Sequence, residues 1–197
     1  MSNNLERMKK EEAFAWYHMH MPNEMQNTAK NLCREYSQLS NEDAEGKQAI
    51  LKKLFGSCTD FTFIASGFQC DYGFNIFFHG MAVVNHNVTI LDTSPVHIGH
   101  EVFIGPHTCI SCAGHALHMA QRAKGVGTTA PITIENGVWI GANVTVCPGV
   151  TIGEGSVIAA GSVVTKDIPK GVLAAGVPAK VIREITEDDL IPEEEIY

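Results

Sequence analysis

Branched aliphatic residues recur at every sixth position over the stretch 134–167. The series runs Ile134, Ile140, Val146, Ile152, Ile158 and Val164. Three positions after each member comes a residue that tolerates a left-handed backbone, namely Gly137, Asn143, Gly149, Gly155, Gly161 and Asp167. Glycine adopts positive φ without a Cβ clash, and Asn and Asp do so at modest cost. The pattern therefore predicts short strands separated by turns, with one strand and one turn in every six residues.

Neither a long helix nor a single strand fits this pattern. A step of six residues moves around the circumference of an α-helix, so the aliphatic residues would not share a face. The stretch also contains several glycines and Pro148, and these cost a helix about 1 and about 3 kcal/mol each. A single long strand fails because a turn residue interrupts it every six positions. A hexapeptide repeat of this kind is typical of a parallel β-helix.

The repeat extends beyond this stretch and has one interruption. A looser period of six is visible from Ile64 to Ile110, and the strict repeat resumes at Ile132. Between them lies the polar, Gly-rich segment 111–131. Long loops that leave a rigid scaffold are commonly functional. We therefore expect a stack of five or six coils with a functional loop inserted into it.

The residues before the repeat are typical of helices. Residues 1–55 are rich in Glu, Lys, Ala, Leu and Met and contain one glycine and one proline. Apolar residues follow a helical spacing in 25–39 and again in 41–55. The organisation that we expect is a helical region at 1–58, a β-helix at 59–183 with the loop 111–131 inserted, and an acidic tail at 184–197.

Composition excludes several classes of protein. Hydrophobic residues make up 45%, charged residues 18%, and the formal net charge is −8, which fits a packed globular chain and argues against a nucleic-acid surface. The polar start has no apolar signal core, and no run approaches the roughly 18 apolar residues of a membrane span. The six cysteines are scattered over the chain, so we interpret them as reduced thiols. These features predict a cytoplasmic protein that binds neither nucleic acid nor a membrane.

A series of short motifs accompanies the repeat. They are CDYGFNI at 70–76, Asn85-x-Asn87, AGH at 113–115, VWIGA at 138–142, PGVTIG at 148–153, AAGSVVTKDIP at 159–169 and AAGVPAKVIREI at 174–185. In these motifs the chain resembles the maltose and galactoside O-acetyltransferases, within the hexapeptide-repeat acyltransferases. The resemblance implies a left-handed parallel β-helix, a homotrimer with active sites between neighbouring subunits, and transfer of an acetyl group from acetyl-CoA to a hydroxyl of a sugar.

The AGH motif carries the expected catalytic residue. Acetyl transfer from a thioester to a hydroxyl needs a base, and imidazole, with a pKa of about 6.5, is largely unprotonated yet basic near neutral pH. His115 matches the family's catalytic histidine, so the resemblance implies that it is the general base for direct attack by the acceptor. A turn N–H near Gly141 and Ala142 would stabilise the oxyanion. No metal is expected.

The resemblance also implies two sets of binding residues. Asp71 and Asn85 match positions that hold the acceptor sugar, with Asp92 as a further candidate, although each could instead satisfy backbone groups of a turn. The positions that match contacts with acetyl-CoA are Trp139, Ala142 and Ala160 for the pantetheine arm, and Thr165, Lys166, Lys180 and Arg183 for the nucleotide end. Cations on an otherwise acidic chain independently favour an anion site, and the alternative is ordinary surface charge.

The chain departs from the family pattern around the expected base. Ala116 follows His115 where the family usually has proline, and Val126 stands where an acidic residue of the loop is expected. Tyr17 falls near the position of another acidic contact of the family. These departures leave open how His115 is held and which acceptor is used.

Other functions stay open at this point. The acceptor could be another small molecule, such as an antibiotic. The γ-class carbonic anhydrases share the β-helix and bind zinc through three histidines, but His115 and His118 are three residues apart, whereas those enzymes typically place two ligands five apart. Cys109-x-x-Cys112 lacks the second half of a metal site. A non-enzymatic scaffold would be favoured if acetyl-CoA failed to bind.

Overall fold

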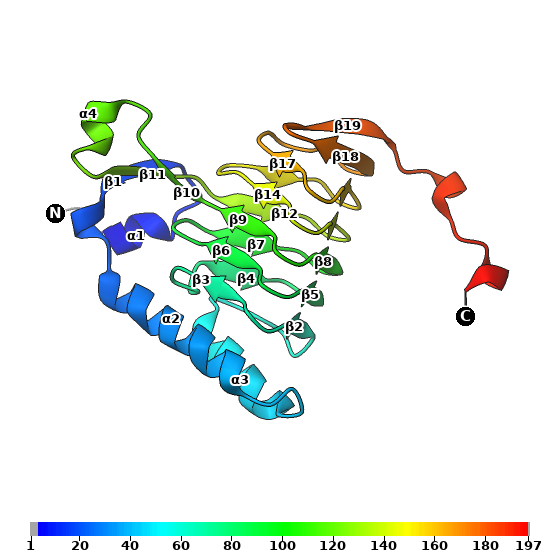
Figure 1. The fold of residues 1–197 in the computed structure, drawn as a ribbon, viewed down its shortest axis with the longest axis horizontal. Coiled ribbons are helices and arrows are strands. Elements are labelled where there is room, and N and C mark those ends of the chain that lie inside the picture. Colours follow the sequence, from blue (N-terminus) through cyan, green and yellow to red (C-terminus); the bar gives the residue numbers. More distant parts are fainter. Residues whose placement is uncertain (1–3, 197) are drawn as a thin grey trace.

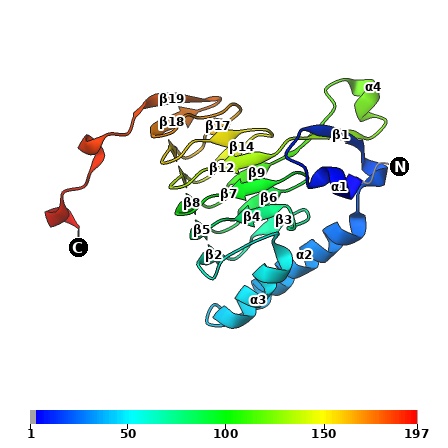
Figure 2. The same cartoon turned by 180° about the vertical axis from the view of Figure 1, so that it is seen from behind.

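A stack of coils forms the body of the molecule (Figure 1). The computed structural model describes residues 4–196. The first three residues of the expected N-terminal region and Tyr197 of the expected tail lie outside the described residues. Figure 2 shows from behind that the C-terminal tail and the inserted loop leave opposite sides of the stack.

Each coil contributes short strands to three sheets that run along the stack. The four-stranded sheet contains β4 (Ile76–Phe78), β7 (Val96–Ile98), β12 (Ile132–Ile134) and β15 (Thr151–Ile152). The five-stranded sheet contains β3 (Gln69–Cys70), β6 (Thr89–Leu91), β9 (Cys109–Ser111), β14 (Thr145–Val146) and β17 (Val163–Val164). The seven-stranded sheet contains β2 (Thr62–Ile64), β5 (Ala82–Val84), β8 (Val102–Ile104), β13 (Trp139–Ile140), β16 (Val157–Ile158), β18 (Val172–Gly176) and the antiparallel β19 (Ala179–Glu184). The predicted parallel β-helix is confirmed.

The residues of the six-residue period fill the interior. Ile140 is fully buried and aligns with Ile104 in the coil before it and Ile158 in the coil after it. Burial of each such side chain stabilises the fold by about 1.5–3 kcal/mol. Of the predicted left-handed residues, Asn143 and the four glycines have positive φ. Asp167 does not, and its carboxylate accepts a hydrogen bond at 2.7 Å from the Thr151 N–H of the preceding coil.

Two helices cover the first coils, as the spacing of apolar residues predicts. They are α2 (Asn23–Gln38) and α3 (Ala44–Leu54), and both lie at the β2 end of the stack (Figure 1). Asp43 caps α3 by accepting a hydrogen bond from the Gly46 N–H at 2.9 Å. Tyr36 of α2 is buried, and its hydroxyl donates to the Ile64 carbonyl of β2. The helices are thereby joined to the coils by both apolar packing and hydrogen bonding.

The segment before α2 differs from the helical expectation. After α1 (Asn4–Met8) comes a strand, β1 (Phe14–Tyr17), and then a 3₁₀ turn at His18–His20. The strand pairs antiparallel with β11 (Val126–Thr129) of the inserted loop, and β11 pairs in turn with β10 (Ala113–His115). A helical expectation for these residues is wrong because aromatic residues favour strands once a pairing partner is present, and this partner lies more than 100 residues away in the chain.

The remaining elements lie outside the coils. The short helix α4 (Met119–Arg122) forms the tip of the inserted loop, and the tail carries 3₁₀ turns at Glu187–Asp189 and Glu193–Glu195. None of the helices between residues 4 and 196 is both long enough and apolar enough to cross a membrane.

Candidate active site

One cleft contains the expected base together with one of the expected acceptor contacts. It has a volume of about 540 Å³, and both His115 and Asp71 line it. Its walls come from the segment between β1 and α2, from the start of α2, from coil turns, and from β10. The strands β1, β11 and β10 lie side by side next to it (Figure 1). The cleft therefore depends on segments that are distant in sequence.

His115 is the last residue of β10 and is exposed to solvent. Its Nδ1 lies 3.3 Å from Nε2 of His18, within hydrogen-bonding distance, and the two ring centroids are 5.0 Å apart. His115 pairs with Gly127 across the ladder. A side chain at position 127 would meet the Trp16 ring at 2.7 Å, so glycine is required there for β1 to pack against the loop.

The sequence analysis did not identify His18. The sequence spacing does contain a signal for His18. Trp16 and His18 are two residues apart and therefore share a face of an extended chain. Their rings are in edge-on contact, with centroids 5.8 Å apart. Using that signal requires knowing that residues 14–17 form a strand, which depends on the distant β11.

Asp71 lies in the coil turn after β3 and is partly buried. Its Oδ1 accepts a hydrogen bond from Nε2 of Gln26, on α2, at 2.8 Å. Burial raises the pKa of this carboxyl above its usual value, and the hydrogen bond from Gln26 opposes that change. The side chain thus has one oxygen fixed by α2 at the border of the cleft.

Asp92 has a different environment from Asp71. It is fully buried, and its carboxylate accepts hydrogen bonds from the backbone N–H groups of Tyr72 at 2.8 Å, Asp71 at 3.1 Å and Asn75 at 3.4 Å. Burial raises the pKa of Asp92 to about 7, although the N–H donors oppose the change. Asp92 does not line the cleft. It holds the turn that carries Asp71.

Three of the expected binding residues, Asn85 for the acceptor sugar and Ala142 and Ala160 for the pantetheine arm, lie at another corner of the stack. Asn85, Ala142 and Ala160 each follow a strand of the seven-stranded sheet, whereas Asp71 follows β3 of the five-stranded sheet and His115 lies on β10, which comes after β9 of that sheet. A strand of three residues separates these corners by about 10 Å. Asn85 here uses its Oδ1 to accept a hydrogen bond from the His86 N–H at 2.7 Å. Within one chain, the structure does not bring Asn85, Ala142 and Ala160 to His115.

The positions expected at the nucleotide end of acetyl-CoA are exposed. Thr165 and Lys166 follow β17, and Lys180 and Arg183 belong to β19. The Arg183 guanidinium makes two hydrogen bonds to the Asp189 carboxylate, at 2.7 and 2.6 Å, and lowers the pKa of Asp189 to about 2. The acidic tail therefore binds one of the expected cations.

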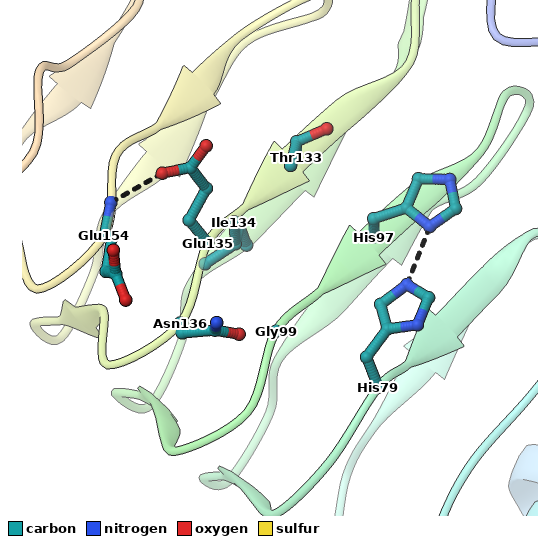
Figure 3. Close-up of a pocket in the computed structure, with 8 residues that line it drawn as sticks. All are labelled: His79, His97, Gly99, Thr133, Ile134, Glu135, Asn136 and Glu154. Carbon is teal, nitrogen blue, oxygen red and sulfur yellow. Dashed lines mark hydrogen bonds between the residues drawn. The ribbon is translucent and has the colours of Figure 1, made fainter.

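A second cavity lies on the outer face of the four-stranded sheet (Figure 3). It has a volume of about 450 Å³, and none of the expected site residues lines it. Its polar groups bind one another: His79 Nε2 lies 2.9 Å from His97 Nδ1, and the Glu154 N–H donates to Glu135 at 2.8 Å. Among residues 4–196, no three His, Cys, Asp or Glu side chains converge as a metal site.

Comparison with known proteins identifies the family. Residues 131–166 match the bacterial transferase hexapeptide model (six repeats), and residues 22–59, which include α2 and α3, match the maltose acetyltransferase hexapeptide capping motif. The galactoside O-acetyltransferase of Escherichia coli (strain K12) is 40% identical over 160 residues, which are 81% of this chain and 79% of that protein. The chain belongs to the hexapeptide-repeat acetyltransferases of the maltose and galactoside type.

Solved structures of this acetyltransferase family share the whole fold. A galactoside acetyltransferase in complex with coenzyme A superposes with a TM-score of 0.87 at 38% identity, over 96% of this chain and 94% of that one. A hexapeptide-repeat acetyltransferase of Vibrio cholerae O1 biovar eltor, complexed with acetyl-CoA, gives a TM-score of 0.82 at 35% identity, over 95% of this chain and 100% of that one. The chain is an acetyl-CoA-dependent acetyltransferase.

Proposed function

We propose that this acetyltransferase moves the acetyl group of acetyl-CoA to a hydroxyl of a galactoside- or maltose-like sugar, with His115 as the general base. The observation that carries the proposal is the cleft in which the imidazole of His115 and the carboxylate of Asp71 both face open space. Imidazole accepts a hydroxyl proton near neutral pH, and a carboxylate accepts hydrogen bonds from sugar hydroxyls. The names of the relatives support the sugar as acceptor.

The chemistry needs no nucleophile from the protein. The acceptor oxygen attacks the thioester carbonyl while His115 takes the hydroxyl proton, and a tetrahedral intermediate forms. The C–S bond then breaks, and the imidazolium gives the proton to the departing thiolate of coenzyme A. The Gly141 N–H already donates to the Ile158 carbonyl at 2.8 Å. We therefore assign the N–H of Ala142 as the donor to the oxyanion.

Asp71 has the role of orienting the acceptor in this proposal. Gln26 occupies its Oδ1, which leaves Oδ2 for a sugar hydroxyl. Asp92 supports the same turn through backbone N–H groups and does not contact the sugar. The nucleotide end of acetyl-CoA lies against Thr165, Lys166, Lys180 and Arg183, where Lys and Arg side chains suit phosphate groups.

A homotrimer completes the site in this proposal. Asn85, Ala142 and Ala160 lie at a different corner from His115, and Trp139 lies on the seven-stranded sheet, so a neighbouring copy must supply them. The outer face of the seven-stranded sheet supports such a contact, because Phe63, Phe103 and Trp139 are 55%, 44% and 56% exposed. They align in one ladder with Val83 and Val157. Exposed apolar patches of this kind mark protein–protein interfaces, and three copies in a ring leave no such face uncovered.

The first test measures thiol release from acetyl-CoA with lactose, a nitrophenyl galactoside, maltose and chloramphenicol as acceptors. We expect release with the sugars, and a loss of at least about 100-fold in His115→Ala. His118→Ala is the matched control, since His118 is exposed in the same loop and does not line the cleft. Undiminished activity in His115→Ala would disprove the base role, and release with chloramphenicol alone would disprove the sugar acceptor.

Mixed trimers test the shared site. Asn85→Ala and His115→Ala chains, each nearly inactive alone, are unfolded and refolded together. If each site combines His115 of one chain with Asn85 of the next, random mixing restores about a quarter of the wild-type activity. If a single chain holds the whole site, the activity of the mixture stays as low as that of each variant alone.

A further inference from the structure

We propose that His18 is a positioning residue for acetyl transfer. Its Nε2 accepts a hydrogen bond from Nδ1–H of His115 and thereby keeps the lone pair of His115 on Nε2, where the acceptor hydroxyl needs it. This inference deepens the proposed function and rests on the base role of His115. It assigns to the N-terminal segment a part in the chemistry as well as in the shape of the cleft.

The geometry links the protonation of the two rings. Neutral imidazole carries one N–H, on either nitrogen, and the nitrogen without hydrogen is the one that can act as a base. His18 Nε2 and His115 Nδ1 are 3.3 Å apart, so one of them donates and the other accepts. When His115 donates, its Nε2 is free to take a proton. When His18 donates, the hydrogen of His115 lies on Nε2 and the base is blocked.

Among residues 4–196, His18 is the side chain that hydrogen-bonds the ring of His115. Ala116 and Val126, the positions at which this chain departs from its family, have apolar side chains and offer no acceptor. Histidine at position 18 supplies an acceptor in their place, and in its neutral form it adds no charge beside the base. The contact between His18 and His115 therefore explains how His115 can be held when Ala116 and Val126 provide no acceptor.

The backbone of His18 is fixed by the inserted loop itself. Its N–H donates to the Gly125 carbonyl at 2.9 Å, directly beyond the last ladder pair between Tyr17 and Val126. Trp16, which is 5% exposed, packs edge-on against the ring of His18. His115 thus lies on β10 and His18 directly after β1, and both strands pair with β11, so this sheet sets the separation of the two imidazoles.

The segment that leads to β1 is also anchored to the coils. Met8 is fully buried, and its carbonyl accepts a hydrogen bond from Nδ2 of Asn75 at 3.0 Å. Glu11 lies 2.8 Å from Nε2 of His97, on β7. These contacts hold the segment between α1 and β1 against the coils, so His18 does not belong to a free chain end.

Two substitutions of His18 distinguish the effect of its hydrogen-bond acceptor from the effect of its ring shape. His18→Gln keeps an acceptor oxygen near the position of Nε2, whereas His18→Phe keeps an aromatic ring without an acceptor. We measure kcat and the KM for acetyl-CoA with a galactoside that the wild type acetylates. We expect kcat to fall at least about tenfold in His18→Phe with KM changed less than about twofold, and to recover largely in His18→Gln.

His20→Phe is the matched control, since His20 is exposed in the same 3₁₀ turn and does not line the cleft. It should retain the wild-type kcat. Equal activity in His18→Phe and His18→Gln, whether both low or both high, would overturn the inference, because the acceptor atom would then have no separate effect.

A second readout does not depend on turnover. In wild-type protein with ¹⁵N-labelled histidine, long-range ¹H–¹⁵N spectra show which ring nitrogen carries hydrogen, and the His115 signals are those missing from His115→Ala. We expect hydrogen on Nδ1 of His115 at a pH where the ring is neutral. Hydrogen on Nε2 would overturn the inference. Full activity in His115→Ala would instead overturn the base role, and the spectrum would still report the tautomer.

Discussion

The regular coils from Ile134 to Val164 and the small sheet of β1, β11 and β10 are built in opposite ways. In the coils, strands such as β13 and β14 pair in parallel with strands of the coils before and after them. In the small sheet, two segments more than 100 residues apart pair antiparallel. The coils bury aliphatic side chains completely, whereas the small sheet and the turn after β1 present two exposed histidines to a cleft. The repeat therefore supplies rigidity, and the proposed base lies where the repeat is interrupted.

The largest effect should come from the coil interior. Ile140→Ala removes a fully buried side chain between Ile104 and Ile158. We expect a loss of about 2–5 kcal/mol in the free energy of unfolding, measured by urea denaturation. Thr151→Ala, at a half-exposed position on β15, is the control and should stay within about 1 kcal/mol. A small effect of Ile140→Ala would show that the stack relaxes around lost volume, and would remove the energetic contrast between the two regions.

Asp92 tests the coil turn beside the cleft, because its carboxyl holds the turn that carries Asp71. Its carboxyl keeps a proton up to a pH of about 7 in the folded protein, whereas an unfolded Asp loses it near 3.9. Between these values the folded state binds more protons, so stability falls as pH rises. From pH 5 to 7, Asp92 should contribute a loss of about 2 kcal/mol.

Urea denaturation of Asp92→Asn at pH 5 and pH 7 isolates that contribution. The variant should lose less stability than the wild type over this interval, since the amide does not titrate. Asp60→Asn, at an exposed position, is a suitable comparison. The same pH dependence in wild type and Asp92→Asn would contradict the prediction.

The smallest effect should come from Glu11, which joins the N-terminal segment to His97. Both side chains are partly exposed, at 60% and 27%, and exposed ion pairs contribute less than about 1 kcal/mol. Glu11→Ala should therefore change the midpoint of thermal unfolding by no more than a few degrees and leave thiol release nearly unchanged. A large loss of activity with unchanged stability would show that the small sheet depends on this contact more than on β1–β11 pairing.

The sequence predicts the coils well because their determinants are local. The period from Ile134 to Val164 defines both the buried face and the turns, and the apolar spacing around Ile50 and Leu51 defines a capping helix. Asp167 is the exception in the turn series, since it lacks positive φ and its carboxylate bonds the Thr151 N–H of the preceding coil. The local spacing of residues does not predict this difference at Asp167.

The site is predictable only in part, for a physical reason. His115 and Asp71 could be proposed from the motifs in which they occur, and the structure places both in one cleft. His18 could not, because its position depends on β1 pairing with a segment more than 100 residues away. The burial of Asp92 could not be predicted either. The backbone N–H groups that bond its carboxyl come from the preceding coil, about 20 residues earlier in the chain.

Nothing in a stack of parallel coils limits the number of coils. The strands of a terminal coil have unpaired backbone groups that can bond another copy, as the strands at the end of a growing fibril do. In this chain α2 and α3 lie over the first coil, and β19 runs against β18 with Lys180, Arg183 and Glu184 exposed along it. Reversal of strand direction and charged side chains both oppose the addition of a further parallel strand. The two ends therefore terminate what would otherwise be an open-ended polymer, and they allow a sequence suited to fibril growth to exist as a discrete enzyme.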